Sequence, residues 1–332
     1  MTQETLERDI IVIPERISRE LFKAGYGVSL HGTVEICHWT KKHLRYKGVC
    51  YKRVFYGIDS HRCFEFSPAG MMCHFRCNFC WRPTQFMRII DMPINRVVEP
   101  DELMFRLELE RRRLMSGYKG TEGIYRELLY EAYIPTHYAI SLSGEPTLYP
   151  KLPKLIRLLD SLPTTRSIFL VTNGCEPDML RRLEYERALP TQLYISMNAP
   201  NRRLFNKIVH PMVRGAWDRF IESLRIMANL ETRTVIRMTM IKGFNDDPGL
   251  IDEYVELLRL ANPHFIEIKS YMHLGYSTRR LKRSNMLSFE EIRDIALRLL
   301  DRLDGFEYMD DYPPSRIVVL QNMDRYVDRW ID

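Results

Sequence analysis

From about residue 61 onward, strand-like and helix-like segments alternate along the chain, and this order restricts the possible folds more than any other feature. Short apolar or β-branched runs predict strands at residues 63–67, 138–143, 167–172, 192–197, 234–241 and 265–270. Amphipathic segments predict helices at residues 101–115, 152–162, 177–187, 216–229, 250–260 and 289–303. Such alternation requires parallel strands that are joined by right-handed crossovers.

The repeats are too few for the full eight of a TIM barrel. We therefore predict an α/β fold, an incomplete (β/α)6 TIM-like barrel over residues 61–304. Residues 1–60 form a predicted N-terminal extension, and residues 305–332 form a C-terminal extension with a strand at 316–320 and a short terminal helix. Because such folds bind ligands at the carboxyl ends of their strands, the residues that follow the strands are candidates for a site.

With 45% hydrophobic and 28% charged residues, the chain has the composition of a globular protein rather than a disordered or fibrous one. No apolar run approaches the roughly 20 residues that span a bilayer, so we expect no membrane partner. Acidic residues interrupt the start of the chain at Glu4, Glu7, Asp9 and Glu15, which argues against a signal peptide and predicts a cytoplasmic protein. Seven cysteines in such a protein favour metal binding or catalysis over disulfide bonds.

Three cysteines lie close together just after the first predicted strand. Cys73, Cys77 and Cys80 have the spacing C-x3-C-x2-C. Three thiolates can hold three irons of a four-iron cluster and leave the fourth iron open for the amino and carboxylate groups of S-adenosylmethionine (SAM). A zinc site completed by His74 is the alternative, although zinc sites usually contain a second cysteine pair further along the chain. The loop therefore resembles that of the radical SAM superfamily, which implies a barrel of the radical SAM type.

Polar residues after the next predicted strands are candidates for SAM binding. The segment Ser143-Gly144-Glu145 resembles a Gly-Gly-Glu motif whose backbone and carboxylate hold the SAM amino group. Further candidates for the carboxylate and ribose of SAM are Thr172, Asn173, Ser196 and Asn198. Each of these residue types is also typical of turns and helix caps, but their shared position at strand ends favours a ligand site.

Three more cysteines, Cys37, Cys50 and Cys63, lie upstream at even intervals in a polar and basic segment. They predict a second three-cysteine [4Fe-4S] cluster, again with an open iron. The alternative is that they are buried small apolar residues. Cys175 stands apart, and we interpret it as structural.

Two basic stretches contain no acidic residue. The candidate RNA-binding residues of the first stretch, 41–53, are Lys41, Lys42, Arg45, Lys47 and Arg53, and those of the second, 269–285, are Arg279, Arg280, Lys282 and Arg283. Clustered Arg and Lys among aromatic residues can neutralise phosphates and stack on unpaired bases, so RNA is a candidate partner. A solvated basic face is the alternative.

Three features carry a family resemblance: the two cysteine triplets, the run at residues 59–63, and the segment Cys80-Trp81-Arg82-Pro83. From about residue 30 to about residue 310, the sequence resembles the tRNA 4-demethylwyosine synthases of the wybutosine pathway. The resemblance implies SAM and two [4Fe-4S] clusters as cofactors. It also implies a carbon–carbon lyase or synthase reaction. A 5′-deoxyadenosyl radical would initiate the condensation of N1-methylguanosine, next to the anticodon of tRNA-Phe, with pyruvate to give 4-demethylwyosine.

In this family picture, pyruvate is activated at the open auxiliary iron or as a Schiff base with a lysine between the second and third cysteines. Lys52 is the only lysine in that interval and is the candidate catalytic residue, with a phosphate contact as the alternative. Eukaryotic members carry a flavodoxin-like domain for which this chain has no room. We therefore expect an archaeal-type monomer with a separate flavodoxin- or ferredoxin-like electron donor.

A base must leave the anticodon-loop stack to reach a buried radical, which requires phosphate anchors and a stacking surface. Trp81 could stack on such a base or pack in the core. Two competing hypotheses remain at this point. One is a radical SAM enzyme that acts on a peptide or protein, and the other is a zinc-stabilised RNA-binding protein without catalysis.

Overall fold

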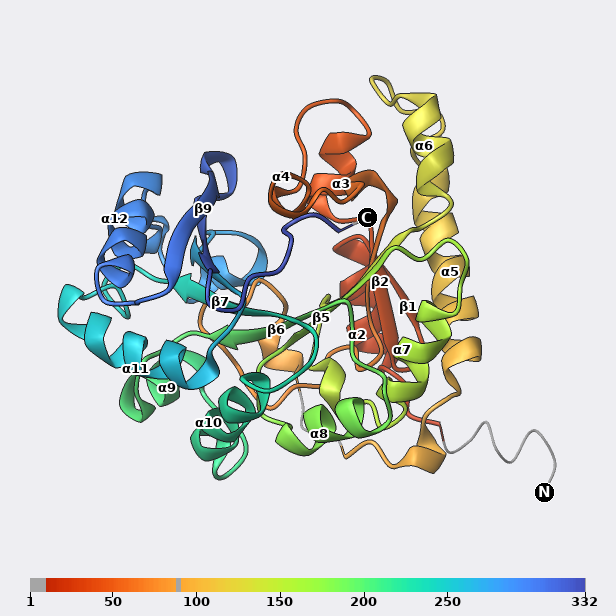
Figure 1. The fold of residues 1–332 in the computed structure, drawn as a ribbon. Coiled ribbons are helices and arrows are strands. Elements are labelled where there is room, and N and C mark those ends of the chain that lie inside the picture. Colours follow the sequence, from red (N-terminus) through yellow and green to blue (C-terminus); the bar gives the residue numbers. More distant parts are fainter. Residues whose placement is uncertain (1–9, 88–90, 332) are drawn as a thin grey trace.

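One ten-stranded sheet forms the centre of the computed structural model, which describes residues 10–87 and 91–331 (Figure 1). The strands are β1 (Tyr26–Ser29), β2 (Gly32–Glu35), β3 (Cys63–Ser67), β4 (His137–Ile140), β5 (Ser167–Thr172), β6 (Gln192–Met197), β7 (Arg233–Met240), β8 (Phe265–Ser270), β9 (Phe306–Tyr312) and β10 (Ile317–Asn322). Glu4, Glu7 and Asp9, on which the prediction about a signal peptide depends, lie outside the described residues.

The neighbours in the sheet run β1-β2-β3-β4-β5-β6-β7-β8-β10-β9, so the sheet is not closed. Strands β3 to β8 pair in parallel, whereas β1, β2 and β3 pair antiparallel at one edge and β8, β10 and β9 at the other. The six parallel strands are the six that the sequence predicts. The prediction of an incomplete barrel is therefore confirmed, and antiparallel strands extend it on both sides.

The described helices are α2 (Glu15–Lys23), α3 (His38–His43), α4 (Tyr51–Tyr56), α5 (Pro100–Ser116), α6 (Arg126–Ala132), α7 (Leu152–Asp160), α8 (Pro177–Tyr185), α9 (Arg202–Val209), α10 (Ala216–Met227), α11 (Ile251–Ala261) and α12 (Phe289–Leu300). All six predicted helices are present. Local chemistry defines their ends: α5, α7 and α8 have proline in the first turn, and Ser288 and Glu291 form a capping box at α12.

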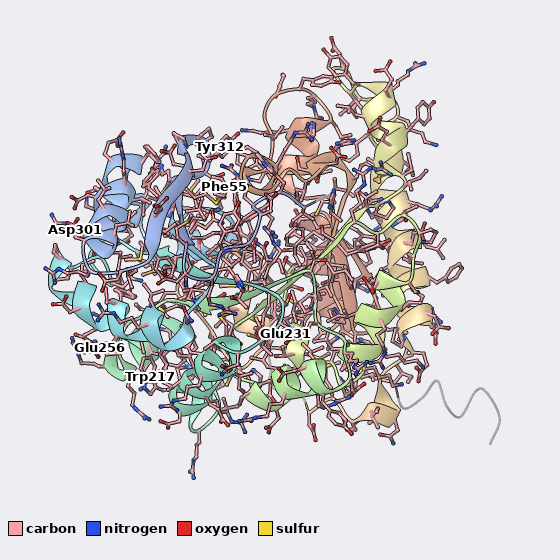
Figure 2. All side chains as sticks on the ribbon, viewed as in Figure 1. Phe55, Trp217, Glu231, Glu256, Asp301 and Tyr312 are labelled. Carbon is pink, nitrogen blue, oxygen red and sulfur yellow. The ribbon has the colours of Figure 1, made fainter. Side chains whose placement is uncertain are left out.

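Helices and side chains fill both sides of the sheet (Figure 2). The crossover helices cover the outer face, while the short helix α4 packs on the inner face near the amino ends of the strands. There Phe55 and Tyr56 of α4 lie in one apolar cluster with Phe169, Val235 and Phe265 of β5, β7 and β8. Helix α4 thus closes the inner face at the amino ends of the strands, and polar residues line this face further along the strands.

The predicted terminal helix is wrong, because the described residues 323–331 contain turns and irregular chain only. This segment instead binds helix α4. Arg329 donates to the carbonyl oxygens of Val54 (2.8 Å) and Phe55 (3.0 Å), and the Ile331 amide donates to Tyr56 O (3.0 Å). Within the described residues, no helix is long and apolar enough to cross a bilayer.

Candidate functional site

Cys73, Cys77 and Cys80 share one loop after β3, and their thiols are close enough for the charge on one to affect another. Burial raises the pKa of Cys77, and negative charge on Cys80 and Cys73 raises it further. The thiols keep some exposed surface, yet the surrounding protein excludes enough water to favour their neutral form. Cationic iron would reverse this preference, because it stabilises thiolates. The donor set therefore fits an iron–sulfur cluster.

The end of β4 lies directly against this loop. The Glu145 amide donates to Met72 O at 2.6 Å, next to Cys73 in the chain. Gly144 has φ +76°, and a Cβ atom at this position would lie 2.0 Å from Ala69 O. Only glycine allows so close an approach in this conformation. The predicted segment 143–145 thus contacts the cysteine loop through its backbone.

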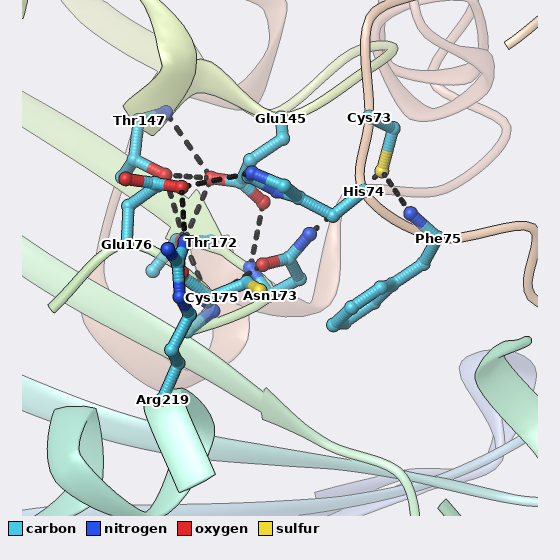
Figure 3. A network of polar contacts seen from close by, with 11 residues as sticks. Cys73, His74, Phe75, Glu145, Thr147, Thr172, Asn173, Cys175, Glu176 and Arg219 are labelled. Atoms are coloured by element: carbon cyan, nitrogen blue, oxygen red, sulfur yellow. Dashed lines mark hydrogen bonds and ion pairs between the residues drawn. The ribbon is translucent and has the colours of Figure 1, made fainter. Parts of the chain in front are cut away.

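The Glu145 carboxylate is the centre of a buried polar network (Figure 3). Its Oε1 accepts from the Thr147 amide (3.1 Å) and hydroxyl (2.6 Å) and from the Thr172 hydroxyl (2.7 Å), and its Oε2 accepts from the Asn173 amide (2.8 Å). The Asn173 side chain in turn donates to Cys73 Sγ at 3.7 Å. The structure therefore brings Glu145, Thr172 and Asn173 together beside the first cysteine of the loop.

The remaining candidates for SAM binding differ in burial and in whether their side chains already have a hydrogen-bond partner. Ser143 shares a hydrogen bond with Thr33 (2.8 Å), and Ser196 is half-buried on β6. Asn198 is 6% exposed, and its side-chain oxygen Oδ1 is buried without a hydrogen-bond partner among the described residues. A buried oxygen without a donor is costly unless a ligand supplies one. Asn198 thus fits a site that a polar ligand completes.

Arg280 contacts the other side of the cysteine loop and does not lie on a free surface. Its guanidinium donates to Asn78 O (3.1 Å) and to Cys80 O. The Tyr276 amide also donates to Trp81 O, at 2.9 Å. The loop after β8 therefore contacts the cysteine loop, and Arg280, a predicted RNA contact, is engaged there.

The upstream triplet forms a second group. Cys37 and Cys50 precede helices α3 and α4, and Cys63 begins β3. The sequence places them far apart, but the charge of Cys37 and Cys50 acts on the thiol of Cys63. Burial raises the pKa of Cys37 to about 12 and raises the pKa values of Cys50 and Cys63 as well. As in the first triplet, such thiols fit a metal cluster that compensates for their charge.

In the zinc alternative, His74 would be the fourth ligand beside Cys73, Cys77 and Cys80. Among the described residues, no three or more Cys, His, Asp or Glu side chains converge as the ligands of one metal ion must. The cysteines of a cluster each bind a different iron and need not converge on one point. His74, the proposed fourth zinc ligand, has its Nε2 2.9 Å from Glu176 Oε1.

Lys52 lies inside the protein on α4, with only 8% of its surface exposed. Its Nζ is 3.9 Å from the ring centroid of Phe169 and 4.7 Å from that of Tyr194. Burial lowers the pKa of Lys52, and the nearby Arg237 guanidinium lowers it further. A lysine with a lowered pKa is suited to imine formation, whereas a buried one is poorly placed to bind a phosphate at the surface.

A pocket of about 180 Å³ is lined by Cys37 of the upstream triplet and by Trp81 and Arg82, which follow Cys80 in the chain. Trp81 is 45% exposed, so its ring is accessible for stacking. Arg82 donates to Glu35 Oε2 (2.9 Å) and to the carbonyl of Leu142 (2.8 Å), and it thereby connects β2, β4 and the cysteine loop.

Several of the other basic candidates already contact other residues of the protein. Arg53 pairs with Asp59 at 2.8 Å, Lys41 lies 3.8 Å from Glu35 and Arg45 donates to the Lys41 carbonyl. Lys42 and Arg279 lie over neighbouring aromatic rings. The exposed candidates are Lys47, Arg279, Lys282 and Arg283.

Two family descriptions match this chain. Residues 68–261 match the radical SAM superfamily, and residues 260–322 match wyosine base formation. The chain is 39% identical to the S-adenosyl-L-methionine-dependent tRNA 4-demethylwyosine synthase of Pyrococcus abyssi, over 94% of this chain and 90% of that protein. The chain belongs to the tRNA 4-demethylwyosine synthase family.

Other members of the synthase family agree. The synthase of Methanocaldococcus jannaschii is 38% identical over 96% of this chain and 99% of its own. A solved structure of TYW1 with a lysine-pyruvate adduct bound has a TM-score of 0.84 at 36% identity, covering 96% of this chain and 99% of that one. The family resemblance and the radical SAM type of barrel are therefore confirmed, and membership implies SAM and a [4Fe-4S] cluster as cofactors.

Sequence reasoning missed several polar residues that lie near the upstream triplet. These are Glu35, Glu65, Arg237, Glu267 and Lys269. A signal was present, because residues two apart on a strand face the same side of a sheet. In β8, Phe265, Glu267 and Lys269 alternate with apolar residues, which indicates an inner face that changes from apolar to charged.

Proposed function

We propose that this chain is a radical SAM enzyme that condenses N1-methylguanosine of tRNA-Phe with pyruvate to give 4-demethylwyosine. The observation on which this proposal depends is the pocket lined by Cys37 of the upstream triplet and by Trp81 and Arg82, which follow Cys80 in the chain. A base that leaves the anticodon loop could stack on Trp81 there. Relatives that carry the synthase name match the chain almost end to end, which supports the same substrate.

Cys73, Cys77 and Cys80 would hold the cluster that, once SAM is bound, delivers the electron that splits SAM and provides a radical for hydrogen abstraction. The role of the chain itself is to position SAM. Glu145, Thr172 and Asn173 order the loop ends beside Cys73, and Asn198 offers an unpaired acceptor. Ser143, Gly144 and Ser196 complete the proposed SAM-binding set.

Cys37, Cys50 and Cys63 would hold the second [4Fe-4S] cluster. Lys52 would bind pyruvate covalently, because its amine is buried two residues from Cys50 and has a lowered pKa. A solved relative is described with a lysine-pyruvate adduct bound, which supports this role. The carboxyl carbon of pyruvate would be lost during the reaction, so the enzyme would be a carbon–carbon lyase as well as a synthase.

For RNA, the exposed Lys47, Arg279, Lys282 and Arg283 are the proposed phosphate contacts. We further propose residues 61–304 as the partial barrel, with residues 1–60 and 305–332 as extensions. The expected cytoplasmic location, monomeric state and separate flavodoxin- or ferredoxin-like donor remain predictions.

The test uses protein purified without oxygen and N1-methylguanosine-containing tRNA, incubated with SAM and pyruvate. We expect iron and sulfide for two clusters and a product with the mass of 4-demethylwyosine. Cys73→Ala should end SAM cleavage, whereas Cys37→Ala should spare uncoupled SAM cleavage and stop product formation. Equal loss of both activities in Cys37→Ala would contradict separate clusters, and a colourless protein with stoichiometric zinc would exclude the enzyme.

A further inference from the structure

Among the described residues, two lysine side chains on the inner face form no direct ion pair, although Cys50 and Glu267 act on both at longer range. Lys269 projects from β8, and its Nζ lies 5.1 Å from the ring centroid of Tyr51 on α4. Lys52 projects from α4 onto the rings of Phe169 and Tyr194. Within residues 10–87 and 91–331, neither ammonium forms a hydrogen bond or an ion pair. Unpaired cations in such an environment are costly, so the site is prepared for an anion.

The carboxylates nearby are already engaged. Glu267 lies 3.1 Å from Arg237 Nε and accepts a hydrogen bond from the Tyr56 hydroxyl at 3.0 Å. Glu65 of β3 faces Arg82 at 4.0 Å. Arg237 is engaged as well, because its second nitrogen donates to the Tyr51 hydroxyl at 2.8 Å. Lys52 and Lys269 therefore act on each other while neither is paired directly with a carboxylate.

We propose that Lys269 binds the carboxylate of the 2-oxo acid whose carbonyl reacts with Lys52. This inference rests on the proposed function, in which Lys52 takes up pyruvate. The neutral amine of Lys52 forms a carbon–nitrogen bond to C2, and the carbonyl oxygen leaves as water. The carboxylate on the neighbouring carbon keeps its charge throughout, so the cation that binds it must lie beside Lys52.

Other groups on the inner face complete this arrangement. The rings of Phe169 and Tyr194, which already contact Lys52, provide an apolar surface for the methyl group of pyruvate. Lys269 is a compact charge on a flexible stem, and it can follow the carboxylate until that group is lost. The pair would thus select 2-oxo acids over neutral ketones.

The test is reductive trapping on the anaerobically purified full chain with its clusters. Pyruvate, or its neutral ester methyl pyruvate, is added with cyanoborohydride, and the labelled residue is identified by peptide mass spectrometry. In Lys269→Met the pyruvate concentration for half-maximal labelling of Lys52 should rise about ten- to a hundredfold, while labelling by methyl pyruvate stays unchanged. Lys269→Arg should restore much of the pyruvate affinity, and Lys119→Met, at an exposed lysine outside the proposed site, should behave like the parent.

The outcomes separate the two proposals. If the parent labels Lys52 but Lys269→Met needs no more pyruvate, the inference is overturned and the proposed function stands. If pyruvate and methyl pyruvate weaken equally in Lys269→Met, Lys269 supports the fold or the cluster and the inference is again overturned. If the parent makes 4-demethylwyosine and never carries pyruvate on Lys52, both the inference and the proposed role of Lys52 are wrong.

Discussion

Gly144→Ala should separate the end of β4 from the cysteine loop. The new Cβ would lie 2.0 Å from Ala69 O and 2.5 Å from Met72 O, whereas ordinary carbon–oxygen contacts are about 3.3–3.6 Å. The two segments must therefore move apart by more than 1 Å or so, a displacement that can cost about a hundredfold in rate. The positive φ of +76° adds about 1–2 kcal/mol of strain.

Gly123→Ala is the matched control, because Gly123 has φ +75° and nothing within 4 Å of the added Cβ. Both variants share the backbone strain, and only Gly144→Ala meets the cysteine loop. Thermal unfolding, iron content and 5′-deoxyadenosine formation would be measured for both without oxygen. We expect Gly123→Ala to lose a little stability alone and Gly144→Ala to lose about a hundredfold in SAM cleavage as well. Equal SAM cleavage in the two variants would refute the role of the close approach.

Two further predictions follow from single contacts. Arg280→Ala should lower iron retention and SAM cleavage, because it removes the hydrogen bonds to Asn78 O and Cys80 O. Lys282→Ala should leave SAM cleavage intact and reduce the salt dependence of tRNA binding by about one ion. The reverse pattern in cleavage and filter-binding assays would contradict this division. Burial lowers the pKa of His137 to about 4, so the unfolded chain takes up its proton first and stability is lost as pH falls from about 6.5 towards 4. His137→Gln should therefore reduce the fall in unfolding temperature between about pH 7.5 and 5.5.

The parallel core was predictable because its signals are local. Strands such as Ser167–Thr172 and Gln192–Met197 are mainly apolar runs that need burial on both faces, and the predicted bounds match the structure. The predicted strand 138–143 ends early, at Ile140, since the following residues leave the sheet to reach the cysteine loop. Strands β1, β2 and β9 were missed because they are short or polar and depend on pairing with distant partners.

The candidate site shows the same division. The cysteines could be found from their spacing, since metal chemistry fixes the residue type. Arg280 could not be separated from Lys282 by sequence, because both are basic residues in one loop and only tertiary contacts show that Arg280 binds the cysteine loop. Lys269 belonged to the same basic stretch, yet strand alternation turns it to the inner face beside Lys52.

The hydrogen bonds from Arg329 and Ile331 to Val54, Phe55 and Tyr56 make the position of helix α4 depend on a segment far along the chain. That helix carries Lys52. A protein truncated before Asp328 should therefore retain its iron and still cleave SAM, while its affinity for pyruvate decreases. Proteolysis or fusion at this segment would then produce an enzyme that cleaves SAM without forming product.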